Sequence, residues 1–161
     1  MTKHVIALKA EGDSGKTQTL LNLINQLYKA TSQDKRVVDN CSNNNCEDKN
    51  VIIEYRGAKI AICTGGDNED VLEKNITFFK NSDWDIAISA TRSKGYTIHA
   101  IEEFAEKEDA QFHRVCKGWV DYPSSSDNPR QQEACDLLIE STAQVMKIII
   151  DGWIDTMINE K

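Results

Sequence analysis

The stretch VIALKAEGDSGKTQTLLNLI, residues 5–24, decides the fold that we expect for this chain of 161 residues. A short apolar run leads into a loop of small residues, and apolar side chains then recur every three or four residues. The first pattern is typical of a buried strand and the second of a helix with one buried face. The sequence therefore predicts a strand at about residues 4–9, a tight loop, and a helix that ends near Ala30.

Predicted strands and helices alternate along the rest of the chain. The runs VIIEY and KIAIC, within residues 51–63, flank the short turn RGA and must be antiparallel, because a parallel crossover needs a dozen residues or more. Helix, strand, helix and strand follow, and a long helix closes the chain at about residues 131–159. The order predicts one α/β domain over residues 1–161, a three-layer α/β/α sandwich. Its sheet is expected to be mostly parallel, with about five strands and one antiparallel edge strand.

The long final helix is expected to dock on the sheet through an apolar face. Leu138, Val145, Ile148 and Ile149 mark that face in the sequence. Gly152 is a point at which the helix could be interrupted, because glycine is a poor helix former.

Composition and charge limit the classes of function. The formal net charge is −7 and apolar residues make up 40% of the chain, which fits a globular protein and argues against broad nucleic-acid binding. No apolar run is long enough to span a bilayer or to form the core of a signal peptide, so we expect a cytoplasmic protein without membrane contact. The five cysteines are interpreted as free thiols. Cys41 and Cys46 share a polar loop, without a second pair or a nearby histidine to complete a zinc site.

The loop at residues 10–17, AEGDSGKT, nearly matches the phosphate-binding pattern G-x-x-x-x-G-K-[ST]. A phosphate group needs several inward-pointing backbone amides, and a helix N-terminus supplies them together with the positive end of the helix dipole. Gly15 can adopt the backbone angles of such a loop, and Lys16 and Thr17 are placed to reach phosphate and Mg²⁺. Only Ala10 departs from the pattern, at a position that often has ordinary strand angles.

The same residues admit a plainer interpretation, in which Asp13 or Ser14 caps the helix and Lys16 and Thr17 are merely solvated. The strand–loop–helix context favours phosphate binding instead. AEGDSGKT resembles the Walker A loop of P-loop NTPases, and the alternation of strands and helices covers nearly the whole chain. The resemblance implies ATP and Mg²⁺ as cofactors, with Lys16 partly exposed beside the phosphates as a catalytic residue and Thr17 on the metal. The cofactor-binding residues that it implies are Gly12, Asp13, Ser14, Gly15, Lys16, Thr17 and Gln18.

A P-loop NTPase also carries an acid that holds Mg²⁺ through water, at the end of an apolar strand. KIAIC runs into TGGD, so Asp67 is the first candidate for this metal-binding and catalytic acid. Glu54, within VIIEY, is the second candidate. The alternatives are that Asp67 is a loop or helix-cap carboxylate and that Glu54 is a solvent-facing residue of the hairpin.

The hairpin followed by TGGD is similar to the arrangement in small GTPases, with one sharp departure. Where those proteins carry an acid that reads guanine, this chain has Lys94, within ATRSKG. A lysine cannot accept the guanine N–H groups, so ATP is expected rather than GTP. In the same loop, Arg92 could act catalytically as a clamp on a transferring phosphoryl group, or Arg92 and Lys94 could bind an acidic substrate. A solvated basic loop is the alternative, and Arg130 is a weaker candidate.

These features predict a P-loop protein that binds ATP with Mg²⁺. The first interpretation is a small ATPase, a hydrolase, or a nucleotide-dependent switch in which the polar segment at residues 39–50 responds to the γ phosphate. One alternative is a small-molecule or nucleotide kinase, in which Arg92 and Lys94 hold the acceptor. Another alternative is a non-catalytic nucleotide-binding module. The sequence names neither a small-molecule or protein partner nor an oligomeric state.

Overall fold

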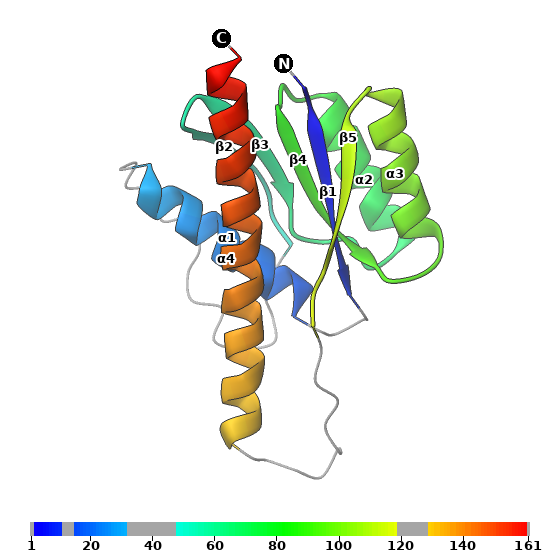
Figure 1. The fold of residues 1–161 in the computed structure, drawn as a ribbon. Coiled ribbons are helices and arrows are strands. Elements are labelled where there is room, and N and C mark those ends of the chain that lie inside the picture. The colour runs from blue at the N-terminus through cyan, green and yellow to red at the C-terminus, as the bar shows by residue number, and fades with distance from the viewer. Residues whose placement is uncertain (1, 11–14, 32–47, 119–128, 161) are drawn as a thin grey trace.

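The computed structural model describes residues 2–10, 15–31, 48–118 and 129–160, and its helices and strands follow the predicted order (Figure 1). In chain order the elements are β1 (His4–Ala10), α1 (Lys16–Ala30), β2 (Asn50–Tyr55), β3 (Ala58–Cys63), α2 (Glu69–Lys80), β4 (Ile86–Arg92), α3 (Tyr96–Lys107), β5 (Gln111–Cys116) and α4 (Pro129–Asn159). The expected α/β class is therefore confirmed.

The five strands form one mixed sheet in the order β2-β3-β4-β1-β5. The pairs β3–β4, β4–β1 and β1–β5 are parallel, whereas β2 pairs antiparallel with β3 at the edge. The prediction of a mostly parallel sheet with one antiparallel edge strand is confirmed. β1 and β4 are central strands with both faces covered, which explains why they read as nearly continuous apolar runs.

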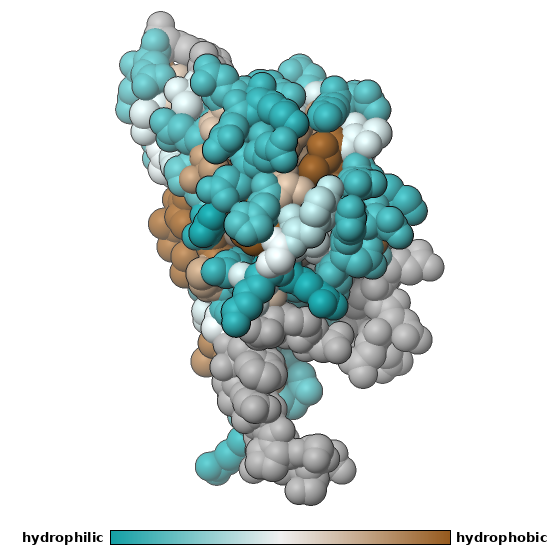
Figure 2. Space-filling view, turned by 90° about the vertical axis from the view of Figure 1, so that its right-hand side faces the viewer, coloured by the Kyte–Doolittle hydropathy of each residue, from teal (hydrophilic) through white to brown (hydrophobic). Residues whose placement is uncertain are grey.

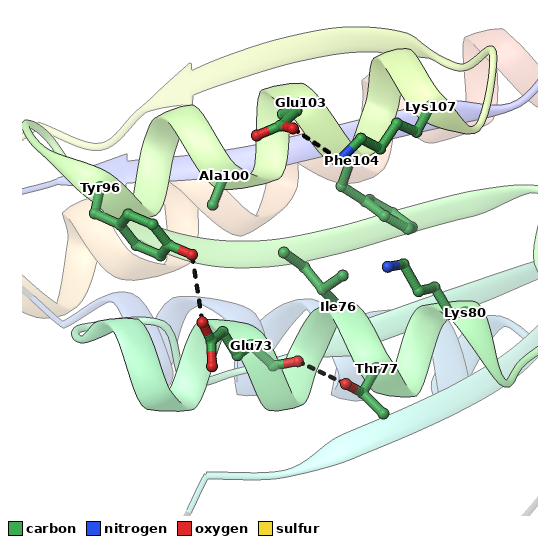
Figure 3. Close-up of a pocket in the computed structure, with 9 residues that line it drawn as sticks. All are labelled: Glu73, Ile76, Thr77, Lys80, Tyr96, Ala100, Glu103, Phe104 and Lys107. Atoms are coloured by element: carbon green, nitrogen blue, oxygen red, sulfur yellow. Dashed lines mark hydrogen bonds and ion pairs between the residues drawn. The ribbon is translucent and has the colours of Figure 1, made fainter.

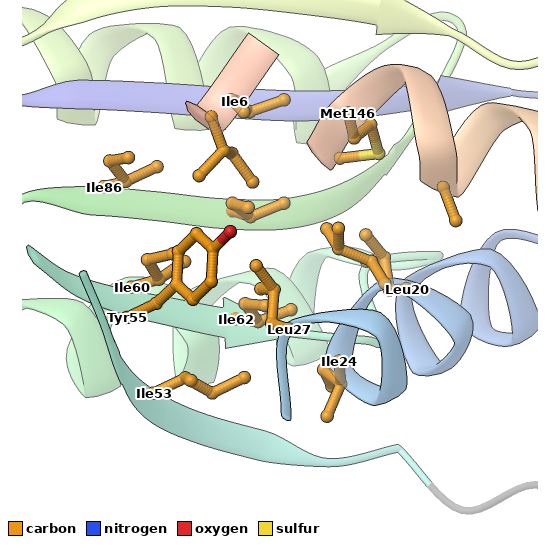
Figure 4. Close-up of a cluster of buried hydrophobic side chains, with 14 of the residues drawn as sticks. Ile6, Leu20, Ile24, Leu27, Ile53, Tyr55, Ile60, Ile62, Ile86 and Met146 are labelled. Atoms are coloured by element: carbon orange, nitrogen blue, oxygen red, sulfur yellow. The ribbon is translucent and has the colours of Figure 1, made fainter. Parts of the chain in front are cut away.

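Helices cover both faces of this sheet (Figure 1). α1 and α4 pack together on one face, and α2 and α3 on the other. Alternate residues of β1 serve the two cores, because successive side chains of a strand point to opposite faces. Ile6 belongs to the core beneath α1 and α4, together with Leu20 and Met146 (Figure 4), and Val5 belongs to the core beneath α2 and α3. Each such buried aliphatic side chain contributes about 1.5–3 kcal/mol to stability.

The β2–β3 hairpin turns through two residues with positive φ. Arg56 has φ 52° and Gly57 has φ 82°, the combination of a type I′ turn, whose twist matches that of the flanking strands. The hairpin is tied to α4, since the Tyr55 hydroxyl donates to Asp151 Oδ1 at 2.7 Å. Arg56 forms ion pairs with Asp151 and Asp155 of the same helix.

α4 runs unbroken through Gly152, and the face that it buries differs from the predicted one. Its buried apolar residues are Ala143, Met146, Ile150, Ile154 and Met157. Val145 and Ile148, which were expected to point inward, are 50% and 70% exposed. Apolar residues surround this part of the helix, so periodicity alone admits more than one buried face.

Figure 2 shows hydrophobic residues gathered along one edge of a largely hydrophilic face. Within the ranges that the structure describes, no helix combines the length and the apolar character needed to cross a bilayer.

Three aromatic side chains pack together near the amino end of the sheet, beneath α4. His4 stacks on Trp153, with 4.2 Å between ring centroids and 4° between planes, and His113 of β5 packs on the same indole at 4.4 Å. His4 Nδ1 and His113 Nε2 lie 3.2 Å apart. Burial and the neighbouring His113 lower the pKa of His4 to about 4, and burial also lowers the pKa of His113. Both rings are therefore neutral at pH 7, and one imidazole donates to the other.

Candidate phosphate-binding site

The connections after β1 and β4 diverge, which makes the end of these two strands a topological switch point of the sheet. β1 leads to α1 on one face, and β4, its neighbour, leads to α3 on the other. In open α/β sheets, ligands bind outside the carboxyl ends of the strands, where neighbouring connections diverge in this way. Ala10 pairs with Arg92 in the β1–β4 register, so the loops that follow these two strands begin side by side.

The start of α1 supplies the first part of the site. Gly15 is the N-cap residue, with a left-handed φ of 82°, and its carbonyl oxygen accepts bonds from the Thr19 amide at 2.9 Å and the Thr19 hydroxyl at 2.8 Å. A glycine N-cap has no side chain to accept bonds from the first-turn amides, which suits them to an anionic ligand. Ala10 ends β1 with ordinary strand backbone, which accounts for the missing glycine at the first loop position.

Lys16, the first residue of α1, is buried at 4% exposure. Its Nζ donates to the Ala10 carbonyl oxygen at 3.2 Å and forms an ion pair with Asp67 Oδ1 at 2.8 Å. The expectation of a partly exposed lysine is therefore wrong. The side chain folds back toward the end of β1, and Asp67 covers its ammonium group.

Asp67 reaches Lys16 although its strand, β3, is not a neighbour of β1. β4 lies between them, and the loop after β3 crosses the end of β4. A Cβ at Gly66 would stand 1.7 Å from the Ala90 carbonyl oxygen of β4, so only glycine allows this close crossing. Asn75 of α2 holds the loop by donating to the Gly65 carbonyl oxygen at 2.8 Å. The crossing places Asp67 over Lys16.

The alternative role of Asp67 as a helix cap is not what the structure shows. Asn68 is the N-cap of α2, and its Oδ1 accepts a bond from the Val71 amide at 2.9 Å. Asp67 precedes the cap, with 54% of its side chain exposed, and its carboxylate is directed to Lys16.

Asp48 is a site residue that the sequence reasoning missed. Thr17 Oγ1 lies 3.4 Å from Asp48 Oδ1 and 3.3 Å from the Thr64 carbonyl oxygen, so its proton can serve either acceptor. The position of Asp48 is fixed by its neighbour Lys49, whose amide donates to Thr64 Oγ1 at 2.8 Å. Because β2 is antiparallel to β3, its start lies at the same edge as the end of β3. The predicted hairpin could therefore have pointed to Asp48, because an acid just before its first strand must lie near the end of its second.

Burial raises the pKa of the Asp48 carboxyl group, and the negative charge of Asp67 raises it further, against the hydrogen bond from Thr17. The carboxylates of Asp48 and Asp67 thus lie close enough to repel each other, one beside Thr17 and the other beside Lys16. Carboxylate, hydroxyl and carbonyl oxygens are the donors that Mg²⁺ prefers, completed by water and phosphate oxygens. The donor set fits the implied metal.

The other predicted residues lie on several different elements. Glu54 is exposed on the hairpin, where it pairs with Lys59 near the start of β3, at the opposite end of the strand from Thr64 and Asp67. This agrees with the interpretation of Glu54 as a solvent-facing residue. Arg92 and Lys94 are exposed at the carboxyl edge, where the Arg92 amide donates to Thr97 Oγ1 at 3.0 Å. Arg130 is exposed in the first turn of α4, and Gln18 is half-buried in α1 beside Gly15.

Several predictions concern residues outside the described ranges. They are the amides of Gly12, Asp13 and Ser14, the pair Cys41 and Cys46, and residues 39–47 of the polar segment 39–50. Within residues 2–10, 15–31, 48–118 and 129–160, no three His, Cys, Asp or Glu side chains cluster to hold a metal by themselves. Mg²⁺ at this site would therefore depend on Thr17, water and phosphate oxygens as well as on carboxylates.

A second hollow lies between α2 and α3, with a volume of about 330 Å³ (Figure 3). Ile76, Ala100 and Phe104 lie between the two helices, and the Tyr96 hydroxyl reaches Glu73 at 3.4 Å at one end. This groove opens on the face opposite α1. Its charged groups are surface side chains, such as Glu103 and Lys107, that pair along one helix.

Comparison with protein-family models, curated proteins and solved structures gave no significant match to this chain. The chemistry of the site is therefore argued from its own side chains. The carboxyl end of the sheet is favoured over the α2–α3 groove as a candidate site because it combines a buried cation, a helix N-terminus and side-chain oxygen atoms.

Proposed function

We propose that this chain is a P-loop domain that binds ATP together with Mg²⁺, and that it acts as a small ATPase or a nucleotide-dependent switch. The observation that carries the proposal is Lys16. A buried ammonium at a helix N-terminus, beside a glycine with left-handed backbone, fits the binding of a polyphosphate. Burial of a charge is costly unless an anion compensates it. Asp67 is that anion in the free protein, and a phosphate oxygen could take its place beside Lys16.

The metal would be held by Thr17 together with Asp67 and Asp48, the last of which replaces Glu54 as the second acidic candidate. Bound Mg²⁺ would neutralise charge on the β and γ phosphates. Lys16 would supply a second positive charge on the same phosphates. Arg92, beside Ala10 at the start of the β4–α3 loop, is near enough to this site to stabilise charge during phosphoryl transfer or to hold an acceptor.

The test is a calorimetric titration with ATP, GTP and ADP, each with and without Mg²⁺. We expect ATP with Mg²⁺ to bind, and GTP not to be preferred by tenfold or more. Phosphate release without an acceptor supports the ATPase interpretation, and ADP formation that requires an acceptor supports the kinase alternative. Binding without turnover supports a binding module, and absence of binding to every nucleotide contradicts the proposal.

A further inference from the structure

Asp67 occupies the position at which a phosphate oxygen would meet Lys16. The two side chains lie 2.8 Å apart, and the lysine side chain is only 3% exposed, whereas that of Asp67 is 54% exposed. A buried ammonium needs a compensating anion, and here a protein carboxylate provides it. Because that carboxylate is on the solvent side, it can leave without opening the core.

Asp67 also faces unfavourable charge on its other side. Its negative charge raises the pKa of Asp48, whose Oδ1 accepts a hydrogen bond from the Thr17 hydroxyl at 3.4 Å. A triphosphate entering this edge without a metal would meet both carboxylates and would have to displace Asp67 from Lys16. A divalent cation between the carboxylates reverses the sign of that interaction, because each carboxylate then has a cation to bind.

Building on the phosphate-binding function proposed above, we propose that Asp67 makes triphosphate binding conditional on Mg²⁺. Without the metal, Asp67 remains on Lys16, competes with the phosphate for the ammonium group and repels it. With the metal, Asp67 exchanges Lys16 for Mg²⁺, and a phosphate oxygen takes the place of the carboxylate beside Lys16. Asp67 thereby regulates access to the loop in addition to contacting the metal.

The test compares wild type with Asp67→Asn and with Asp70→Asn. Asp70 is exposed in the first turn of α2, three residues further on, so its substitution removes the same charge without touching Lys16. Binding of tripolyphosphate and of a non-hydrolysable ATP analogue is measured by calorimetry, in EDTA and in excess Mg²⁺. Tripolyphosphate isolates the phosphate contacts from those of the base.

We expect wild type and Asp70→Asn to bind both ligands at least tenfold more tightly with Mg²⁺ than in EDTA. Asp67→Asn should bind them in EDTA at least tenfold more tightly than wild type does, and should lose most of the Mg²⁺ effect. Asp67→Ala also lacks the side-chain amide that asparagine would place beside Lys16, and it should behave in the same way as Asp67→Asn. Circular dichroism checks that each variant is folded.

Two results would overturn the inference and can be told apart. If wild type binds with Mg²⁺ but Asp67→Asn and Asp67→Ala bind metal-free ligand no better than wild type, the gating role of Asp67 is wrong and the phosphate site stands. If wild type binds neither ligand with Mg²⁺, the proposed function fails, and the gating role fails with it.

Discussion

The two ends of β1 bury titratable side chains in different ways. Beyond the carboxyl end, the Lys16 ammonium is buried against the carboxylate of Asp67. At the amino end, His4 and His113 are neutral rings packed on Trp153. A buried ammonium depends on an anion beside it, whereas a stack of neutral rings needs no further partner. The carboxyl end can therefore exchange a protein anion for a ligand anion, and the amino end is built for packing.

Removal of the buried charge should give the largest effect. Lys16→Ala is expected to weaken ATP binding about a hundredfold, or about 2.7 kcal/mol, because it removes the positive charge that meets the phosphates. The protein should remain folded, since Asp67 can be hydrated where it stands. Calorimetric titration measures the affinity, with Lys29→Ala, in the last turn of α1, as the control. Equal affinities in the two variants would contradict the phosphate-loop assignment.

Lowering the pH should destabilise the protein through His4, at the amino end of β1. The folded pKa of His4 is about 4, below the value of about 6.5 expected in the unfolded chain. Below about pH 6.5 the unfolded state therefore binds more protons than the folded state does. Lowering the pH from 7 to 5 should reduce the free energy of unfolding by about 2 kcal/mol. Urea denaturation at the two pH values measures this loss.

His4→Phe sharpens the pH test, because phenylalanine keeps a ring against Trp153 but cannot take up a proton. We expect its stability to change much less between pH 7 and pH 5 than that of wild type. An unchanged pH dependence in this variant would assign the acid sensitivity to other groups.

The acid that the sequence reasoning missed can be compared with the one that it named. Asp48→Asn should weaken the apparent affinity for Mg²⁺ in the presence of ATP about tenfold, or about 1.4 kcal/mol. Glu54→Gln should leave it unchanged, because Glu54 is exposed on the hairpin. A titration of MgCl₂ at fixed ATP compares the two variants. A larger loss in Glu54→Gln would restore the original assignment.

Ala10→Gly should have the smallest effect of these substitutions. Ala10 has strand backbone and pairs with Arg92, so glycine offers no conformational advantage there. We expect a loss of stability of about 0.5–1 kcal/mol from the greater freedom of the unfolded chain, and no change in ATP affinity beyond twofold. A gain in affinity of tenfold would show that alanine impairs the loop.

The order of the elements could be predicted because strands and helices differ in the spacing of their apolar residues. The convergence of the loops after β1, β3 and β4 followed from parallel pairing, and the pair Lys16–Asp67 and the register partners Ala10 and Arg92 lie at that one edge. The order of the strands could not be predicted. Several orders are compatible with right-handed crossovers, and only the packing of the finished sheet places β4 between β3 and β1.

The predictions that failed depend on contacts between distant segments. Lys16 was expected at the surface because the sequence does not reveal that Asp67 covers it. Ile148 and Ile150 are chemically equivalent, and only the packing of α4 in the finished fold decides that Ile150 is buried and Ile148 exposed. Asp48 was overlooked because it precedes a strand, whereas the two acidic candidates, Glu54 and Asp67, lie within a strand and after one.

Selection would treat position 66 in two different ways, depending on what is selected. The loop after β3 can lie on the end of β4 only because Gly66 lacks a Cβ atom, which would overlap the backbone oxygen of Ala90. No choice of rotamer relieves that overlap, since the backbone fixes both atoms. In a library screened for folding alone, larger residues at position 66 would survive by lifting the loop away from the sheet. In a library screened for phosphate binding that depends on Mg²⁺, glycine would be retained, because a lifted loop carries Asp67 away from the metal that it would hold with Thr17 and Asp48.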